Sequence, residues 1–129
     1  MCIRDSSRKI LDISRKNGKY RNLYKKSFEN KIKIINKYNV VSLIGAMTYC
    51  GTHQSLFKLV SYYLSKKGYF IFTHRVDLWK KLKFDNILEK LTDFDSIYIS
   101  RPLNYLPNNK DFGSDIKIRI VLLKKNNLI

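Results

Sequence analysis

The chain has 129 residues, of which 44% are hydrophobic and 13% aromatic, and its formal net charge is +16. This length fits one domain, and the apolar content suffices for a packed core, which excludes a disordered polyelectrolyte. No apolar run reaches the roughly 18 residues of a membrane-spanning helix, and no signal-peptide pattern opens the chain. Cys2 and Cys50 cannot build a disulfide framework or a four-ligand zinc site, so we expect a cytoplasmic protein without a metal or a membrane partner.

The basic charge has two competing explanations. Lys, Asn, Ile, Tyr and Phe make up 61 of the 129 residues, and all five are encoded by AT-rich codons. Only 7 of the 26 basic residues are Arg, the residue that binds phosphates and bases bidentately. Because the basic residues are also dispersed in short pairs, a solvated lysine surface is favoured over a phosphate-binding face. The alternative is a small nucleic-acid-binding module whose exposed Tyr and Phe side chains stack on bases.

The first six residues, Met1 to Ser6, match the translation of a transposase end tag used in sequencing libraries. The tag ATG-TGT-ATA-AGA-GAC-AG encodes Met-Cys-Ile-Arg-Asp and the start of a Ser or Arg codon. The match predicts that residues 1–6 are a non-native scar, that the tag encodes Asp5, and that the native chain begins upstream of Ser7. The alternative is a genuine N-terminus with the same residues.

The first half of the chain predicts a helix, a weak strand and a buried strand. Residues 7–17 have helical apolar spacing, and residues 22–27 are a weak strand candidate. A polar connection over 28–37 leads to residues 39–44, a nearly continuous apolar run. This run is typical of a strand that is buried on both faces, and it ends at Gly45.

The clearest helix is predicted over residues 52–67. Thr52 can cap its start, the lysines at 66 and 67 suit its C-terminal dipole, and Gly68 can terminate it. A second buried strand follows at once over residues 69–74. The helix between two apolar strands predicts a parallel β-α-β unit.

The remaining elements complete an α/β pattern. A helix is predicted over 77–92, a strand over 96–100, a loop over 101–113 and a final strand over 116–123. Because no helix joins the last two strands, they form an antiparallel hairpin. We therefore predict a mixed, mostly parallel sheet that is flanked by helices and ends in this hairpin.

Two segments carry a resemblance to a known family. Residues 37–49, Lys-Tyr-Asn-Val-Val-Ser-Leu-Ile-Gly-Ala-Met-Thr-Tyr, resemble the fourth strand of class I S-adenosylmethionine-dependent methyltransferases. Residues 64–73, with Lys-Lys-Gly before an aromatic strand, resemble the family's Lys-Pro-Gly-Gly turn and fifth strand. Met47-Thr48-Tyr49 and Tyr105-Leu106-Pro107 are similar to motifs of the Williams–Beuren-region branch. The resemblance implies the C-terminal part of a Rossmann-like domain.

The resemblance also implies a cofactor, S-adenosyl-L-methionine, and residues that would hold it. Gly45, Ala46 and Met47 would face its methionine part, while Ser27 and Phe28 stand where the family often has an Asp beside the adenine. For Gly45 and Ala46 the alternative is a simple tight turn. The family's acidic-Gly-x-Gly loop is absent from the sequence and would lie upstream of Ser7.

Methyl transfer from a sulfonium is an in-line displacement that needs alignment more than acid–base groups. Tyr49 and His74 are the catalytic candidates, with packing or surface roles as their alternatives; His53 is the only other histidine. The substrate-facing candidates are Tyr49, Arg75, Trp79 and Tyr105, although Arg75 can equally be solvated and Trp79 can pack a helix on the sheet. The methyl acceptor is not identified by the sequence.

The predicted organisation is an incomplete single domain over residues 7–125 and a tail over 126–129. In this family, strands one and two lie between strands three and four, so a fragment would expose the edge of residues 39–44. We therefore expect the isolated chain to be poorly soluble or to dimerise through that edge. We also expect it to be inactive, because most of the pocket would be missing.

Overall fold

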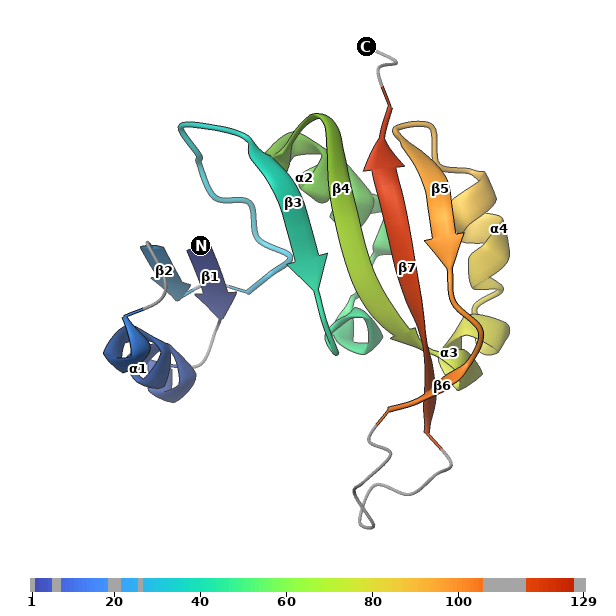
Figure 1. Cartoon of the computed structure of the whole chain (residues 1–129), viewed down its shortest axis with the longest axis horizontal. Coiled ribbons are helices and arrows are strands. Elements are labelled where there is room, and N and C mark those ends of the chain that lie inside the picture. The colour runs from blue at the N-terminus through green and yellow to red at the C-terminus, as the bar shows by residue number, and fades with distance from the viewer. Residues whose placement is uncertain (1, 6–7, 19–21, 26, 106–115, 127–129) are drawn as a thin grey trace. The chain divides into compact units, whose positions relative to one another are not determined.

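The computed structural model describes residues 2–5, 8–18, 22–25, 27–105 and 116–126 (Figure 1). The chain divides into two compact units, residues 1–33 and residues 34–129, and each is described by itself. No helix in the described part of the chain has the length and apolar character needed to cross a membrane.

The first unit is a small parallel β-α-β motif. Strand β1 (Cys2–Asp5) pairs in parallel with β2 (Asn22–Lys25), and helix α1 (Arg8–Asn17) joins them. The helix ends before Gly18, whose φ of 63° lies in the left-handed region and whose N–H donates to the Arg15 carbonyl oxygen. Residues 2–5 of the predicted scar thus form β1, and their origin stays a prediction.

The second unit contains the larger sheet. Its elements in chain order are β3 (Tyr38–Leu43), the 3-10 helix η1 (Met47–Tyr49), α2 (His53–Tyr63), β4 (Leu64–Arg75), α3 (Val76–Lys81), α4 (Phe84–Glu89), β5 (Phe94–Ile99), β6 (Leu103–Asn104) and β7 (Lys117–Lys125). The strand order is β3-β4-β7-β5, and β6 pairs with β7 beyond β5. Strands β3 and β4 are parallel, whereas β7 is antiparallel to β4, β5 and β6. The predicted α/β class, mixed sheet and C-terminal antiparallel pairing are confirmed.

The core lies on the face of the sheet that the helices cover. Figure 1 shows α2, α3 and α4 behind the strands of the second unit. Five phenylalanines from α2, β4, α4 and β5 meet there, with ring centroids between 4.9 and 6.3 Å apart: Phe57, Phe70, Phe72, Phe84 and Phe94. Each is at most 5% exposed. Burying one such ring stabilises the fold by roughly 1.5–3 kcal/mol, so this cluster is a main source of stability.

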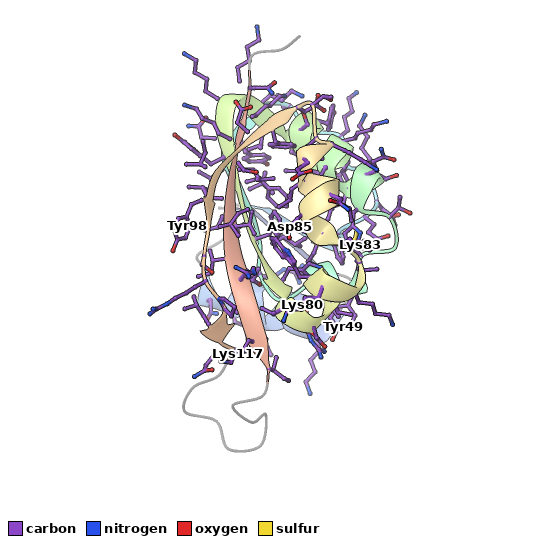
Figure 2. The ribbon with its side chains drawn as sticks, turned by 90° about the vertical axis from the view of Figure 1, so that its right-hand side faces the viewer. Tyr49, Lys80, Lys83, Asp85, Tyr98 and Lys117 are labelled. Atoms are coloured by element: carbon purple, nitrogen blue, oxygen red, sulfur yellow. The ribbon has the colours of Figure 1, made fainter. Side chains whose placement is uncertain are left out.

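The prediction that the 39–44 strand is buried on both faces is wrong. Val40 is 57% exposed, and among the described residues β3 pairs with β4 alone. The crossovers from β3 to β4 and from β4 to β5 run in the same direction across the sheet. Because such crossovers are right-handed, both place their helices on one face. No described helix of the second unit covers the opposite face, which we call the open face. Figure 2 shows Tyr98 of β5 on this side, away from the helices.

The predicted helix over 52–67 is wrong at its C-terminal end. Helix α2 ends at Tyr63, where the N–H of Leu64 donates to the Val60 carbonyl oxygen. The next residues bulge out of the β3–β4 pairing, since the partner of Tyr38 is Leu64 but that of Val40 is Tyr69. Gly68 lies in this bulge, where a Cβ atom would stand 2.9 Å from the Ser65 carbonyl oxygen.

The lysines that stabilise the end of α2 are not the predicted ones at 66 and 67. The Lys125 ammonium donates to the carbonyl oxygens of Ser61 at 2.6 Å and of Leu64 at 3.0 Å. Lys37 donates to the Tyr62 carbonyl oxygen, and its ammonium lies 4.1 Å from the centre of the Tyr62 ring. Cations from β7 and from the segment before β3 therefore satisfy the carbonyl oxygens that a helix end leaves free.

The predicted helix over 77–92 is two short helices. Lys83 adopts a left-handed conformation with φ of 49° between α3 and α4. Trp79 and Phe84 pack at 4.8 Å between ring centroids, and both are buried. Five residues apart on a continuous helix they would differ by about 140° in direction, so only a break allows both rings to face the core.

The C-terminal strands differ from the prediction in their bounds. Strand β5 begins two residues before the predicted start at 96, and only its first residue, Phe94, is buried. The predicted loop over 101–113 contains the short strand β6, and its part after Tyr105 lies outside the described residues. The final strand is confirmed.

Lys125→Met tests the helix cap that β7 supplies. We expect the substitution to lower the free energy of unfolding by roughly 1–3 kcal/mol, because two carbonyl oxygens lose their donor. Urea denaturation measures this change. Lys90→Met, at the exposed residue after α4, is the matched control, and equal losses in the two variants would contradict the capping role.

Candidate active site at the carboxyl edge of β3 and β4

The parallel strands β3 and β4 end side by side, with Leu43 paired to Phe72. The chain then turns at Gly45, which has φ of 72°, a conformation that favours glycine. The N–H of Gly45 donates to the Thr73 hydroxyl oxygen at 2.9 Å. Thr73 is 7% exposed, so a buried side chain of β4 fixes the exposed turn that follows β3.

Tyr105 reaches the same turn from the C-terminal part of the unit. Its hydroxyl oxygen lies 3.5 Å from the position that a Cβ atom of Gly45 would occupy. Its N–H donates to the Ile116 carbonyl oxygen at 3.1 Å, directly after the pairing of β6 with β7. The structure therefore brings together Gly45 and Tyr105, two site residues that the sequence predicts on separate segments.

The residues after Gly45 differ widely in exposure. Ala46 precedes η1, and its carbonyl oxygen accepts a hydrogen bond from the N–H of Tyr49. Met47 is only 1% exposed, whereas Tyr49 is 77% exposed. Met47 thus anchors η1 in the core, and Tyr49 presents its side chain to solvent.

Arg75 ends β4 and pairs with Asp77 at the start of α3. Its guanidinium makes two hydrogen bonds to the carboxylate, at 3.1 and 2.7 Å. These bonds, together with the positive charge of Arg75, lower the pKa of Asp77. The carboxylate of Asp77 therefore balances the positive charge of Arg75 at the protein surface.

His74 is buried in an aromatic cluster. It is 2% exposed, and its ring lies 4.8 Å from that of Phe84, 6.0 Å from His53 and 6.2 Å from Trp79. Neither ring nitrogen of His74 has a hydrogen-bond partner in the described part of the chain. Burial, and to a lesser extent the neighbouring His53, lowers the pKa of His74 to about 4, so the ring is neutral near pH 7. Trp79 is buried beside it, as in the packing alternative.

Three polar residues of this region were not anticipated from the sequence: Thr73, Ser100 and Arg119. Arg119 lies opposite His74 in the β4–β7 pairing, and its guanidinium donates to the Ser100 carbonyl oxygen at 2.7 Å. The same guanidinium lies 5.5 Å from the centre of the Trp79 ring. The alternation of residues 116–120 places Arg119 on the same face as His74 once the pairing is known, but the sequence does not give that pairing.

The described residues contain no group of three His, Cys, Asp or Glu side chains that could hold a metal ion. The described polar side chains in contact with the glycine turn are the Thr73 hydroxyl and the Tyr105 phenol, while the exposed Tyr49 lies on η1 and Arg75 pairs with Asp77 at the end of β4. Such groups can bind and orient a small polar molecule.

No protein-family model matches the sequence, and no curated protein matches it significantly. Solved structures match nearly the whole chain. The plantazolicin methyltransferase BpumL, solved with a desmethylPZN analog and SAH, is 13% identical with a TM-score of 0.72, over 98% of this chain and 67% of that chain. The N-methyltransferase NodS from Bradyrhizobium japonicum WM9 is 7% identical with a TM-score of 0.69, over 97% and 72%. An rRNA methylase from Streptococcus thermophilus is 14% identical with a TM-score of 0.66, over 97% and 72%.

The chain has the fold of the S-adenosylmethionine-dependent methyltransferases. The predicted resemblance is confirmed at the level of the fold. In open α/β sheets, ligands bind outside the carboxyl ends of the strands. Within this methyltransferase fold, Gly45, Thr73 and Tyr105 stand at that edge.

The five predicted cofactor-binding residues are divided between the two units of the chain. Ser27 and Phe28 lie in the first unit, where the Ser27 hydroxyl oxygen accepts a hydrogen bond from the N–H of Glu29 at 3.4 Å. Gly45, Ala46 and Met47 lie in the second unit. That these five residues contact one cofactor stays a prediction.

Thr73→Val tests the link between β4 and the glycine turn. We expect the Gly45 amide to exchange its hydrogen roughly 2- to 10-fold faster, because valine matches the shape of threonine but cannot accept the hydrogen bond. Hydrogen exchange followed by NMR measures this rate. Thr73→Ser keeps a hydroxyl and should stay near the original rate, so equal acceleration in both variants would count against the link.

The buried neutral His74 predicts a pH-dependent stability. Its pKa is about 4 in the folded protein and 6.5 in the unfolded chain, so below pH 6.5 the unfolded state takes up the proton first. Stability should therefore fall between pH 6.5 and 4, by up to about 3 kcal/mol. In His74→Phe, thermal unfolding across this range should lose that part of the pH dependence. An unchanged profile in the variant would show that other groups cause it.

Proposed function

We propose that the chain is part of an S-adenosylmethionine-dependent methyltransferase that transfers a methyl group to an acceptor by in-line displacement. The observation that carries this proposal is the glycine turn at the carboxyl edge of β3, held by Thr73 and approached by Tyr105. It occupies the ligand-binding edge of a fold shared with methyltransferases that were solved with SAH. We also propose that the protein is cytoplasmic, and this part of the proposal rests on the cysteine content alone.

The residues of the turn suit a donor of this kind. Gly45 has no side chain, so a ligand can approach the backbone closely, and Thr73 keeps the turn in place while it does so. When bound, S-adenosylmethionine supplies an electrophilic methyl group on its sulfonium. What the protein adds is alignment, which by itself can contribute several kcal/mol to lowering a barrier.

The acceptor side of the site is assigned to exposed side chains near the turn. Tyr49 projects from η1, directly after the turn, and Arg75 ends the neighbouring strand. We propose that Tyr49 contacts the acceptor. His74 is buried and neutral, so we propose for it a packing role beneath this edge rather than direct contact with the acceptor.

The isolated chain is proposed to be a fragment of the enzyme. Its sequence contains no acidic-Gly-x-Gly loop, the segment that the resemblance places after the first strand of the family. The fragment proposal is tested by resequencing the source locus across Ser7 with a library that carries no transposase tag. Native codons that continue into an apolar strand and a glycine-rich loop would support the proposal.

The purified 129-residue chain should not transfer methyl groups. We expect no radioactive methyl to pass from labelled S-adenosylmethionine to small-molecule, protein or RNA extracts above the level of a buffer control. The chain extended by its native upstream codons should bind SAH and transfer the label. Transfer by the 129-residue chain alone would overturn the fragment proposal, and failure of a folded, extended chain to bind SAH would overturn the methyltransferase proposal.

A nucleic-acid-binding module remains the second candidate, favoured by one feature of the open face. The Lys124 ammonium lies 5.7 Å from the centre of the Tyr69 ring, and both residues face away from the helices together with Tyr98. Aromatic rings beside cations can stack on bases. Binding of a single-stranded oligonucleotide that weakens steeply with salt and is lost in Tyr69→Ala would support this candidate.

A further inference from the structure

Tyr105 reaches the glycine turn across a neighbouring strand. It follows β6, which pairs with β7, whereas Gly45 follows β3, and β4 lies between β3 and β7 in the sheet. The contact between the Tyr105 hydroxyl and the Gly45 position therefore spans the carboxyl end of β4. Thr73, which holds the turn, lies on β4 beneath this span.

The backbone of Tyr105 is held by hydrogen bonds, whereas its side chain is partly exposed to solvent. The N–H bond to Ile116 and the β6–β7 pairing hold its backbone. The residue is 41% exposed, so its side chain is partly open to solvent. Because the phenol oxygen contacts the Gly45 position, a molecule bound beside this contact can accept a hydrogen bond from the phenol.

We propose that Tyr105 is a binding residue of this site, which donates a hydrogen bond from its phenol to a polar molecule seated on the Gly45 turn. The inference rests on the proposed function, because that function supplies the molecule, and it adds a specific contact from the C-terminal hairpin. The loss of one such hydrogen bond weakens binding without altering the fold, since phenylalanine retains the ring.

NMR titration of the isotope-labelled chain, extended by its native upstream codons, with S-adenosylhomocysteine tests this contact. The probe is added into the millimolar range, and the amide signals of Gly45 and Tyr105 are followed. We expect both signals to move, and we expect Tyr105→Phe to weaken binding roughly 3- to 10-fold while its spectrum stays dispersed. Tyr98→Phe, at an exposed tyrosine of β5, is the matched control and should bind like the original chain.

The outcomes separate the inference from the function on which it rests. If the Gly45 signal moves but Tyr105→Phe binds as tightly as Tyr98→Phe, the role of Tyr105 is wrong and the proposed function stands. If the Gly45 signal does not move in a folded, extended chain, the probe does not occupy the turn, and both are overturned. Selective weakening by Tyr105→Phe supports both.

Discussion

The alternation of side chains along β4 determines both the core and the site of the second unit. Phe70, Phe72 and His74 point to the helices and are buried there. Tyr69, Ile71 and Thr73 point to the opposite face because successive residues of a strand alternate. One strand thus anchors the aromatic core with one set of side chains and holds the Gly45 turn with the other. A register slip by one residue would remove both at once.

The charges at the C-terminal end of β4 are also divided between the two faces of the strand. His74, on the core side, is kept neutral by burial and lies opposite Arg119, whose guanidinium is satisfied in part by the Ser100 carbonyl oxygen. Arg75, on the other side, pairs with Asp77 at the surface. The side chains that contact the Gly45 turn, those of Thr73 and Tyr105, carry neutral hydroxyls. This arrangement suits binding by hydrogen bonds more than attraction of a highly charged ligand.

Local patterns in the sequence predicted which elements form, because apolar spacing and glycine stops act over a few residues. They did not predict where α2 ends, since the cations at its C-terminus come from Lys37 and Lys125, both distant in sequence. They also missed the break at Lys83, which tertiary packing of Trp79 and Phe84 imposes. They also missed the exposure of β3, which arises because the β3–β4 and β4–β5 crossovers both place their helices on one face of the sheet. The residues of the site were predicted singly, but the contact between Gly45 and Tyr105 and the support from Thr73 require the strand order.

The fold alone does not select a methyl acceptor. Proteins that share it include a plantazolicin methyltransferase, an N-methyltransferase and an rRNA methylase, each at most 14% identical to this chain. Such different acceptors on one fold imply that specificity lies in exposed side chains at the carboxyl edge rather than in the core. Among the described residues near that edge, Tyr49 and Tyr105 are exposed aromatic groups, and both follow the Gly45 turn in the sequence. Because the backbone of Tyr105 is held next to β7 and Tyr49 lies on η1, the second unit sets the relative placement of the two phenols. In the proposed function, the acceptor is a molecule that fits this placement.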